Sequence, residues 1–245
     1  MATSRTNRVR RTSRRARLLH TAVYLTTLAL LLTGWWLWAG GEGRPSPLAT
    51  ILGAPDTRLH VWFGRGLAVA LVLPLVVWWR GVIAFVRETF RFDRGDGRWW
   101  RRWPGAILTG RFARHEGHFD PGQRVANVLM VGGLLVLTAT GIGMTVLHGG
   151  PLFAWLGMIH RWTTFVVTPV IAGHLLVAIG VLPGYRGVWR AMHLGGRVRE
   201  ETARRLWPAW TERSAGARSR EDAARRRRTE EVTRAAMPTH RGNRR

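Results

Sequence analysis

Apolar residues are gathered into four long runs, and most charged residues lie between or outside these runs. Each run meets or exceeds the roughly 20 residues that an α-helix needs to cross a bilayer core about 30 Å thick. The runs occupy residues 18–39, 59–79, 125–147 and 155–182. We therefore predict an all-α membrane protein built as an up-and-down bundle of four transmembrane helices.

The first run could be either a cleaved secretory signal or a transmembrane helix. Seven arginines precede it, and basic residues also precede the apolar segment of a secretory signal. A signal has an apolar segment of about 7–15 residues followed by a small-x-small cleavage site. The run at 18–39 is longer, and no such site follows it. We interpret it as a helix that the protein retains.

The arginines predict how the spans are oriented. The chain has 38 basic residues, all of them arginine, and a net charge of +24. Seven lie in the tail 1–17, ten in the connection 80–124, and seventeen after residue 183, whereas only two lie within 40–58. Arginine is enriched in cytoplasmic segments of membrane proteins. We expect a multi-pass protein of the bacterial cytoplasmic membrane with both termini in the cytoplasm.

The same distribution argues against nucleic acid as a partner, because the arginines flank the predicted spans. We divide the chain into a basic tail 1–17, a membrane domain 18–200 and a tail 201–245. The last segment has little apolar content and four consecutive arginines at 225–228, so we predict that it is disordered. For this tail we favour contact with anionic membrane lipid or a partner subunit over contact with nucleic acid.

The chain contains no cysteine, which limits its redox chemistry. A disulfide, a thiolate zinc site, a cysteine-ligated iron–sulfur cluster and covalent c-type haem are all excluded. Glycines cluster in the third run, where they either allow close helix packing or leave space for a flat cofactor. Both interpretations stay open from the sequence. They concern Gly132, Gly133, Gly141 and Gly143.

Four histidines lie within the runs or at their edges, and the predicted orientation sorts them by membrane side. His20 begins the first run at its cytoplasmic end, and His60 begins the second run at the opposite end. His160 and His174 both belong to the fourth run, with His160 nearer the outer end. We therefore pair His20 with His174 and His60 with His160.

Helix geometry agrees with this pairing. Fourteen residues separate His160 from His174, an advance of about 21 Å and a rotation about 40° short of four full turns. Both imidazoles then project from nearly the same face at different depths, as two haems stacked inside one bundle require. Neutral imidazole is a good iron ligand, and ionisable residues inside membranes are usually functional. We predict two b-type haems with the axial ligands His20, His60, His160 and His174.

Zinc fits these pairs poorly, because each supplies only two ligands and has no carboxylate nearby. An alternative from another class is a cofactor-free membrane anchor with structural histidines. Arg65 and Arg161 lie close to the outer pair, where they either pair with haem propionates or extend to the membrane surface. We assign the other histidines to the surface: His115, His118, His148, His193 and His240.

The pattern resembles the membrane cytochrome b (gamma) subunit of bacterial formate dehydrogenases, within the diheme cytochrome b family shared with nickel–iron hydrogenases. The resemblance covers roughly residues 14–200. Its motifs are "RLLH", "RLHVWFGRGLA", "HFDPGQRVANVLMVGGLLVLTATGIGM", "IHRWTTFVVTPVIAGHLLVAI" and "GVWRAMHLGGRV".

The resemblance implies an electron-transfer subunit without a substrate-oxidising site of its own. Its partners would be an iron–sulfur subunit and a catalytic, molybdopterin-containing subunit outside the membrane. Electrons would pass inward to menaquinone or ubiquinone near the cytoplasmic side. The family's quinone-binding segment, Asn-x-Gly-Gln, maps onto Asp120, Gly122 and Gln123, together with His174. Here aspartate replaces the asparagine, and capping of the third helix is the interpretation of Asp120 that we favour over proton relay. A hydrogenase subunit and a quinol-oxidising reductase subunit stay open as alternatives.

Overall fold

A computed structural model describes residues 7–40 and 43–236 of the chain. Helices account for most of this part, and one short antiparallel strand pair links residues 8–10 to residues 197–199. In chain order the elements are β1 (Arg8–Arg10), α1 (Arg14–Trp38), α2 (Pro47–Leu52), α3 (Asp56–Val77), α4 (Trp79–Thr89), α5 (Asp96–Thr109), α6 (Pro121–Val146), α7 (Gly150–Ala178), the 3-10 helix η1 (Pro183–Tyr185), α8 (Arg190–His193), β2 (Arg197–Arg199), α9 (Glu200–Leu206) and α10 (Pro208–Ala236).

Among the described residues, four helices are long and apolar enough to cross a membrane, namely α1, α3, α6 and α7. The predicted fold class is therefore confirmed. The helix ends differ from the apolar runs where local chemistry sets them. Helix α1 begins before its run because the Ser13 side chain accepts a hydrogen bond from Ala16 N. Helix α7 ends before its run does, close to Gly180 with its positive φ of 75° and to Pro183.

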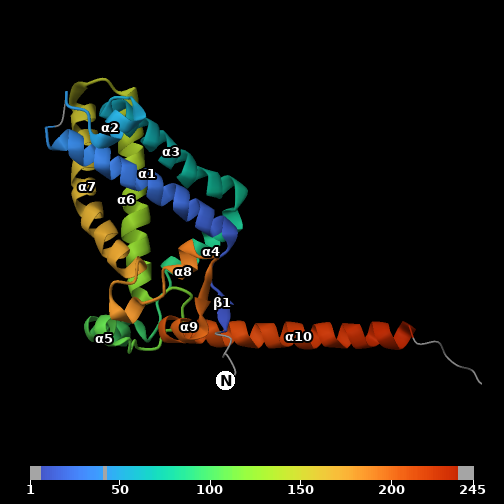
Figure 1. Cartoon of the computed structure of the whole chain (residues 1–245). Coiled ribbons are helices and arrows are strands. Elements are labelled where there is room, and N and C mark those ends of the chain that lie inside the picture. The colour runs from blue at the N-terminus through green and yellow to red at the C-terminus, as the bar shows by residue number, and fades with distance from the viewer. Residues whose placement is uncertain (1–6, 41–42, 237–245) are drawn as a thin grey trace, which may run out of the picture.

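The spans form two antiparallel hairpins. Helix α1 packs along α3, and α6 packs along α7, while the two hairpins meet mainly through α3 and α6. Figure 1 shows the first hairpin crossing the second at a large angle, so that α1 and α7 face each other from different hairpins. Side chains of all four helices line a cavity between the two hairpins.

Glycines bring α6 and α7 close together. A Cβ atom on Gly133 would lie 2.2 Å from Val167 Cγ2, and one on Gly143 would lie 2.7 Å from Leu156 Cδ1. Both distances are shorter than real contacts, so a side chain at either position would force the neighbouring residue of α7 to move. For Gly133 and Gly143, close helix packing is therefore the interpretation that holds.

The connections at one end of the spans form a compact layer, which we call the cap. It comprises β1, β2, α5, α8, α9, η1, the segment 110–120 and the first turn of α10. Strand β1 pairs with β2 in the register Arg8↔Arg199. Val198 of β2 and Ala203 of α9 are fully buried. Both ends of the membrane domain are thus tied together beside the spans (Figure 1).

One arginine joins the N-terminal segment to the C-terminal segment inside the cap. The Arg11 guanidinium lies 4.2 Å from the centre of the Trp207 ring and 4.5 Å from that of Trp210. Its Nη1 atom also lies 2.8 Å from a ring nitrogen of His118. Such a stacked cation stabilises the contact between two segments that lie almost 200 residues apart in the chain.

The described part of the C-terminal tail consists mainly of α9 and α10, where the composition predicts disorder. Leu206 and Trp207 are buried in the cap and anchor the start of the tail there. Beyond Thr211 the tail continues as an exposed helix rich in alanine, arginine and glutamate, all strong helix formers. Residues 237–245 lie outside the described part of the chain.

Candidate functional site: paired histidines between two hairpins

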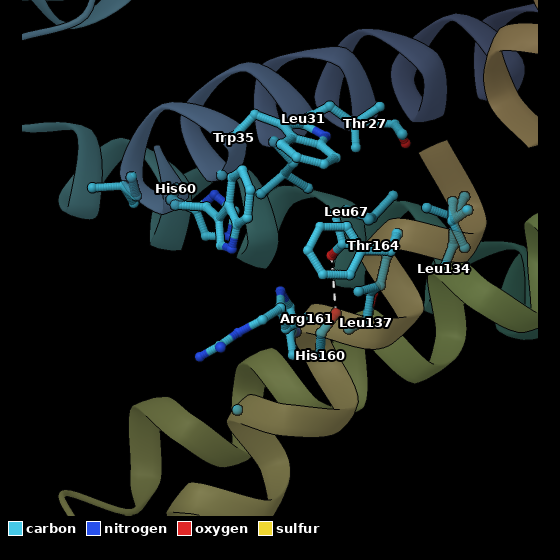
Figure 2. A pocket seen from close by; sticks show the side chains of 18 of the residues that line it. Thr27, Leu31, Trp35, His60, Leu67, Leu134, Leu137, His160, Arg161 and Thr164 are labelled. Atoms are coloured by element: carbon cyan, nitrogen blue, oxygen red, sulfur yellow. Dashed lines mark hydrogen bonds between the residues drawn. The ribbon is translucent and has the colours of Figure 1, made fainter. Parts of the chain in front are cut away.

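The outer candidate site lies between the first turns of α3 and the first half of α7. His60 from α3 and His160 from α7 face each other with ring centroids 6.2 Å apart and ring planes at 70°. Figure 2 shows the cavity beside them, with Thr27, Leu31 and Trp35 of α1 opposite residues of α6 and α7. The structure therefore brings together the two histidines that the sequence placed on the outer side.

The inner candidate site lies at the other end of α7. His174 faces His20 of α1, with ring centroids 6.3 Å apart and ring planes at 55°. Helix α7 thus contributes one histidine to each site, as its fourteen-residue spacing predicted. The two remaining ligands come from different helices, α1 for the inner site and α3 for the outer site.

The separation within each pair matches a metal held by two imidazoles. A metal–nitrogen bond to histidine is about 2 Å long, and the ring centre lies about 1 Å behind that nitrogen. Two imidazoles on opposite sides of one iron therefore have centroids about 6 Å apart. The observed values of 6.2 and 6.3 Å fit this requirement at both sites. Within residues 7–40 and 43–236, no group of three or more histidine or acidic residues is placed to bind a metal ion.

Threonine hydroxyls determine which ring nitrogen is available at the outer site. Thr33 Oγ1 lies 2.9 Å from His60 Nδ1, and Thr140 Oγ1 lies 2.9 Å from His160 Nδ1. In both histidines Nδ1 is therefore engaged, which leaves Nε2 as the nitrogen that is free to bind iron. Metal-binding histidines commonly use their second nitrogen in this way.

The inner site has different surroundings. His20 Nδ1 is buried and has no hydrogen-bond partner among the described residues. The rings of Tyr24 and His193 lie 5.5 and 6.0 Å from the His20 ring. His193 is exposed, as we predicted, but its ring contact with His20 was not foreseen, because it depends on how α8 folds back onto α1.

The outer cavity has a volume of about 270 Å³ and an apolar lining. All four spans contribute to it, mainly with leucine side chains such as Leu31, Leu67 and Leu137. Apolar walls of this kind suit the faces of a porphyrin and exclude water. His60 and His160 are among the residues that line the cavity.

Two glycines face the outer imidazoles. A Cβ atom on Gly34 would lie 3.2 Å from His60 Cε1, and one on Gly141 would lie 3.5 Å from His160 Cε1. Gly141 thus differs from its neighbours Gly133 and Gly143, because it adjoins the candidate site instead of a packed helix. Gly132 has no atom within 4 Å of its would-be Cβ. Of the four glycines that the sequence left undecided, only Gly141 borders the site.

The two arginines beside the outer pair lie in different places. Arg161 lines the outer cavity, and its side chain extends away from the α7 ribbon in Figure 2. Arg65 is exposed and is not among the residues that line this cavity. Of the two arginines, the structure therefore places Arg161, but not Arg65, in the lining of the outer cavity.

The predicted quinone-binding segment has a structural role that the structure defines. Asp120 caps α6, because its Oδ1 accepts a hydrogen bond from Gln123 N at 2.9 Å. Burial raises the pKa of Asp120, although the hydrogen bond from Gln123 and the nearby His115 and Arg11 act in the opposite direction. A Cβ atom on Gly122 would lie 2.8 Å from Trp99 Cη2. No hydrogen bond or ring contact among the described residues links this segment to His174.

Two cap histidines correct the surface assignment. His115 is only 1% exposed, and its Nε2 lies 2.8 Å from the carbonyl oxygen of Leu206. His118 is half-buried, and burial together with the Arg11 charge lowers its pKa to about 3. The assignment failed because the segment 110–120 is covered by α9 and the start of α10.

A buried ion cluster holds the cap to α6 and was also missed. Arg124 lies 2.8 Å from an Asp93 carboxylate oxygen and 2.9 Å from one of Asp96. Glu88 accepts hydrogen bonds from the backbone amides of His118 and Phe119. The signal in the sequence was the presence of acidic residues in a connection otherwise dominated by arginine.

Two facing imidazole pairs inside an apolar four-helix bundle define the class of protein: a membrane cytochrome of the b type. Comparison with family models agrees with this class. Residues 11–195 match the family described as prokaryotic cytochrome b561, and the chain belongs to this family. It is a membrane-embedded electron-transport protein of a family that binds b-type haem. A search among curated proteins gave no match.

Proposed function

We propose that this chain is the diheme cytochrome b subunit of a formate dehydrogenase-like complex, carrying electrons from an extracytoplasmic partner to membrane quinone. The observation that carries the proposal is the presence of two imidazole pairs with metal-binding separation at opposite ends of α7. A single pair would provide one electron-transfer site. Two pairs at different depths provide a path across the membrane.

The protein's own residues would hold the cofactors and keep water away. His60 and His160 would bind the outer iron, and His20 and His174 the inner iron, each as a neutral imidazole. Haem bound by two imidazoles supplies one-electron transfer with little change of geometry. The leucine-rich walls of the cavity exclude water, and Arg161 would neutralise a propionate at its open side.

The direction and the partners follow from the resemblance and the charge distribution. Both termini and the cap would face the cytoplasm, so the outer site would receive electrons from an iron–sulfur subunit attached to a molybdopterin-containing subunit. Menaquinone or ubiquinone would be reduced near His174, with the segment of Asp120, Gly122 and Gln123 on the same side of the membrane. Reduction there takes up cytoplasmic protons while electrons arrive from outside, which helps to charge the membrane.

A haem count tests the proposal directly. We expect the purified protein to show a b-type reduced-minus-oxidised spectrum and two haems per chain. His60→Ala should lose the outer haem alone, and His174→Ala should lose the inner haem alone. A colourless protein would favour the cofactor-free anchor, and a His174→Ala variant with both haems and unchanged spectra would show that the assigned pairing is wrong.

The electron donor separates the remaining alternatives. In membranes that contain the intact complex, formate should reduce the b haems within seconds, whereas hydrogen should not. Reduction by hydrogen would favour a hydrogenase subunit. Reduction by added quinol coupled to a terminal acceptor would favour a quinol-oxidising reductase.

A further inference from the structure

We infer that Thr33 and Thr140 are positioning residues that lower the reduction potential of the outer haem below that of the inner haem. This inference rests on the proposed function, because it requires that both histidine pairs bind haem. It adds a reason why electrons would pass from the outer site to the inner site. The argument depends on how each threonine uses its single hydroxyl proton.

Both hydroxyl protons are already used within the threonines' own helices. Thr33 Oγ1 donates to the Ala29 carbonyl at 2.9 Å, and Thr140 Oγ1 donates to the Val136 carbonyl at 2.7 Å. A hydroxyl has one proton to donate and two lone pairs to accept with. We therefore infer that each threonine acts as an acceptor toward the neighbouring histidine, whose Nδ1 then carries the proton.

A Thr-Gly pair contacts the outer histidine once in each hairpin. In the first hairpin Thr33 and Gly34 lie near the end of α1 and contact His60 near the start of α3. In the second, Thr140 and Gly141 lie near the end of α6 and contact His160 near the start of α7. The threonine fixes the ring nitrogen, and the glycine leaves room for the ring. Both threonines are buried, with exposures of 0% and 5%.

The inner pair has no equivalent. No hydrogen bond reaches a ring nitrogen of His20 or His174 from the described residues, and His20 Nδ1 is buried without a partner. The neighbours of the His20 ring are the aromatic rings of Tyr24 and His193. The two sites therefore differ in the hydrogen bonding of their ligands, although their ring separations are nearly equal.

This difference has a direction. A histidine that donates its Nδ1 proton to an acceptor becomes a more basic ligand, which stabilises the oxidised iron. Hydrogen bonding beyond the axial ligands is one of the means by which a protein adjusts a haem potential. The outer site should therefore hold an electron less tightly than the inner site. Electrons that arrive at the outer site would then move inward spontaneously.

Isosteric substitutions test the inference. Thr33→Val and Thr140→Val keep the side-chain shape and remove the acceptor. Their matched controls are Thr26→Val in α1 and Thr145→Val in α6. The hydroxyls of Thr26 and Thr145 also donate to carbonyls of their own helices, at 2.8 Å in each case, but form no hydrogen bond with a histidine.

The measurement is an optical redox titration of the purified cytochrome with its two haems. The outer component is identified as the one that His60→Ala removes. We expect the ratio of reduced to oxidised outer haem, at a fixed ambient potential, to rise severalfold in each valine variant. A tenfold rise would equal a shift of about 59 mV for a one-electron couple. The inner component and both control variants should keep their potentials, and Thr33→Ser should restore the original value.

Three results would overturn the inference. An outer potential equal to that of the controls would show that the hydroxyls do not tune the haem. Loss of the outer haem from both valine variants would show that they serve retention instead. Absence of haem from the unchanged protein would overturn the proposed function and this inference with it, whereas two haems with unshifted potentials would overturn only the inference.

Discussion

Each outer imidazole is enclosed by groups that fix both its hydrogen bonding and its position. His60 lies against Thr33 on one side of the ring and against Gly34 at Cε1. The contact at Gly34 is the tighter of the two glycine contacts, because its would-be Cβ lies 3.2 Å from the ring, compared with 3.5 Å at Gly141. Gly34 therefore restricts the position of the His60 ring more than Gly141 restricts that of the His160 ring.

Gly34→Ala should consequently weaken the outer haem site. The added methyl group forces the His60 ring to move by a few tenths of an ångström, an overpacking effect that typically costs about 1–3 kcal/mol. We expect a reduced outer-haem content after purification, with the inner haem retained. Gly141→Ala is the matched control and should keep both haems, since its Cβ makes an ordinary contact. Equal haem loss in the two variants would contradict the proposed arrangement.

The histidine pairs could be proposed from the sequence more readily than their surroundings. The expected membrane side rests on arginine placement, and the shared face of His160 and His174 rests on helix geometry, so neither expectation needs tertiary detail. The threonine contacts require knowledge of which helices adjoin. A local signal was nonetheless present, because a Thr-Gly pair near the end of one span precedes each outer histidine near the start of the next.

At the scale of helices, close packing of α6 and α7 sets the position of His160. Gly133 receives the Val167 side chain, which is almost completely buried. Valine has one strongly preferred rotamer in a helix, so it cannot easily turn away from an added methyl group. The contact lies between the two histidines of α7 and thus bears on both sites.

Gly133→Ala should separate α6 from α7 and destabilise the bundle by about 1–3 kcal/mol, the usual range for overpacking. Gly132→Ala is an adjacent control, since nothing lies within 4 Å of its would-be Cβ. We expect a lower melting temperature for Gly133→Ala, followed by the loss of haem absorbance on heating in detergent. A Gly132→Ala variant that melts equally early would show that the effect does not come from the contact with Val167, since alanine by itself favours a helix over glycine.

At the start of α7 and in the tail, the helices of the structure extend beyond what the sequence pattern indicates. Helix α7 begins five residues before the apolar run at 155–182, because Gly150 and Pro151 form its first turn. The tail was assigned to disorder from its average composition. Two of its residues, Leu206 and Trp207, are enough to anchor it, because the cap provides a surface that the sequence alone does not show.

The whole molecule has an unequal distribution of charge along its long axis. The cap and the exposed part of α10 contain most of the arginines, whereas the connections at the opposite end contain few (Figure 1). The inner histidine pair lies toward the cap, and the outer pair lies toward the connections at the other end. The proposed direction of electron flow therefore depends on which end faces the cytoplasm.

The absence of natural cysteine makes that orientation directly measurable. Single cysteines at Arg44, in the connection between α1 and α2, and at Glu221, in α10, would both lie at exposed positions. In intact cells whose outer envelope is permeable to the reagent, a maleimide that cannot cross the cytoplasmic membrane should label Arg44→Cys. It should label Glu221→Cys only after that membrane is permeabilised. The reverse pattern would place the His20–His174 pair on the outside, and electrons entering from an extracytoplasmic partner would then meet the site without threonine acceptors first.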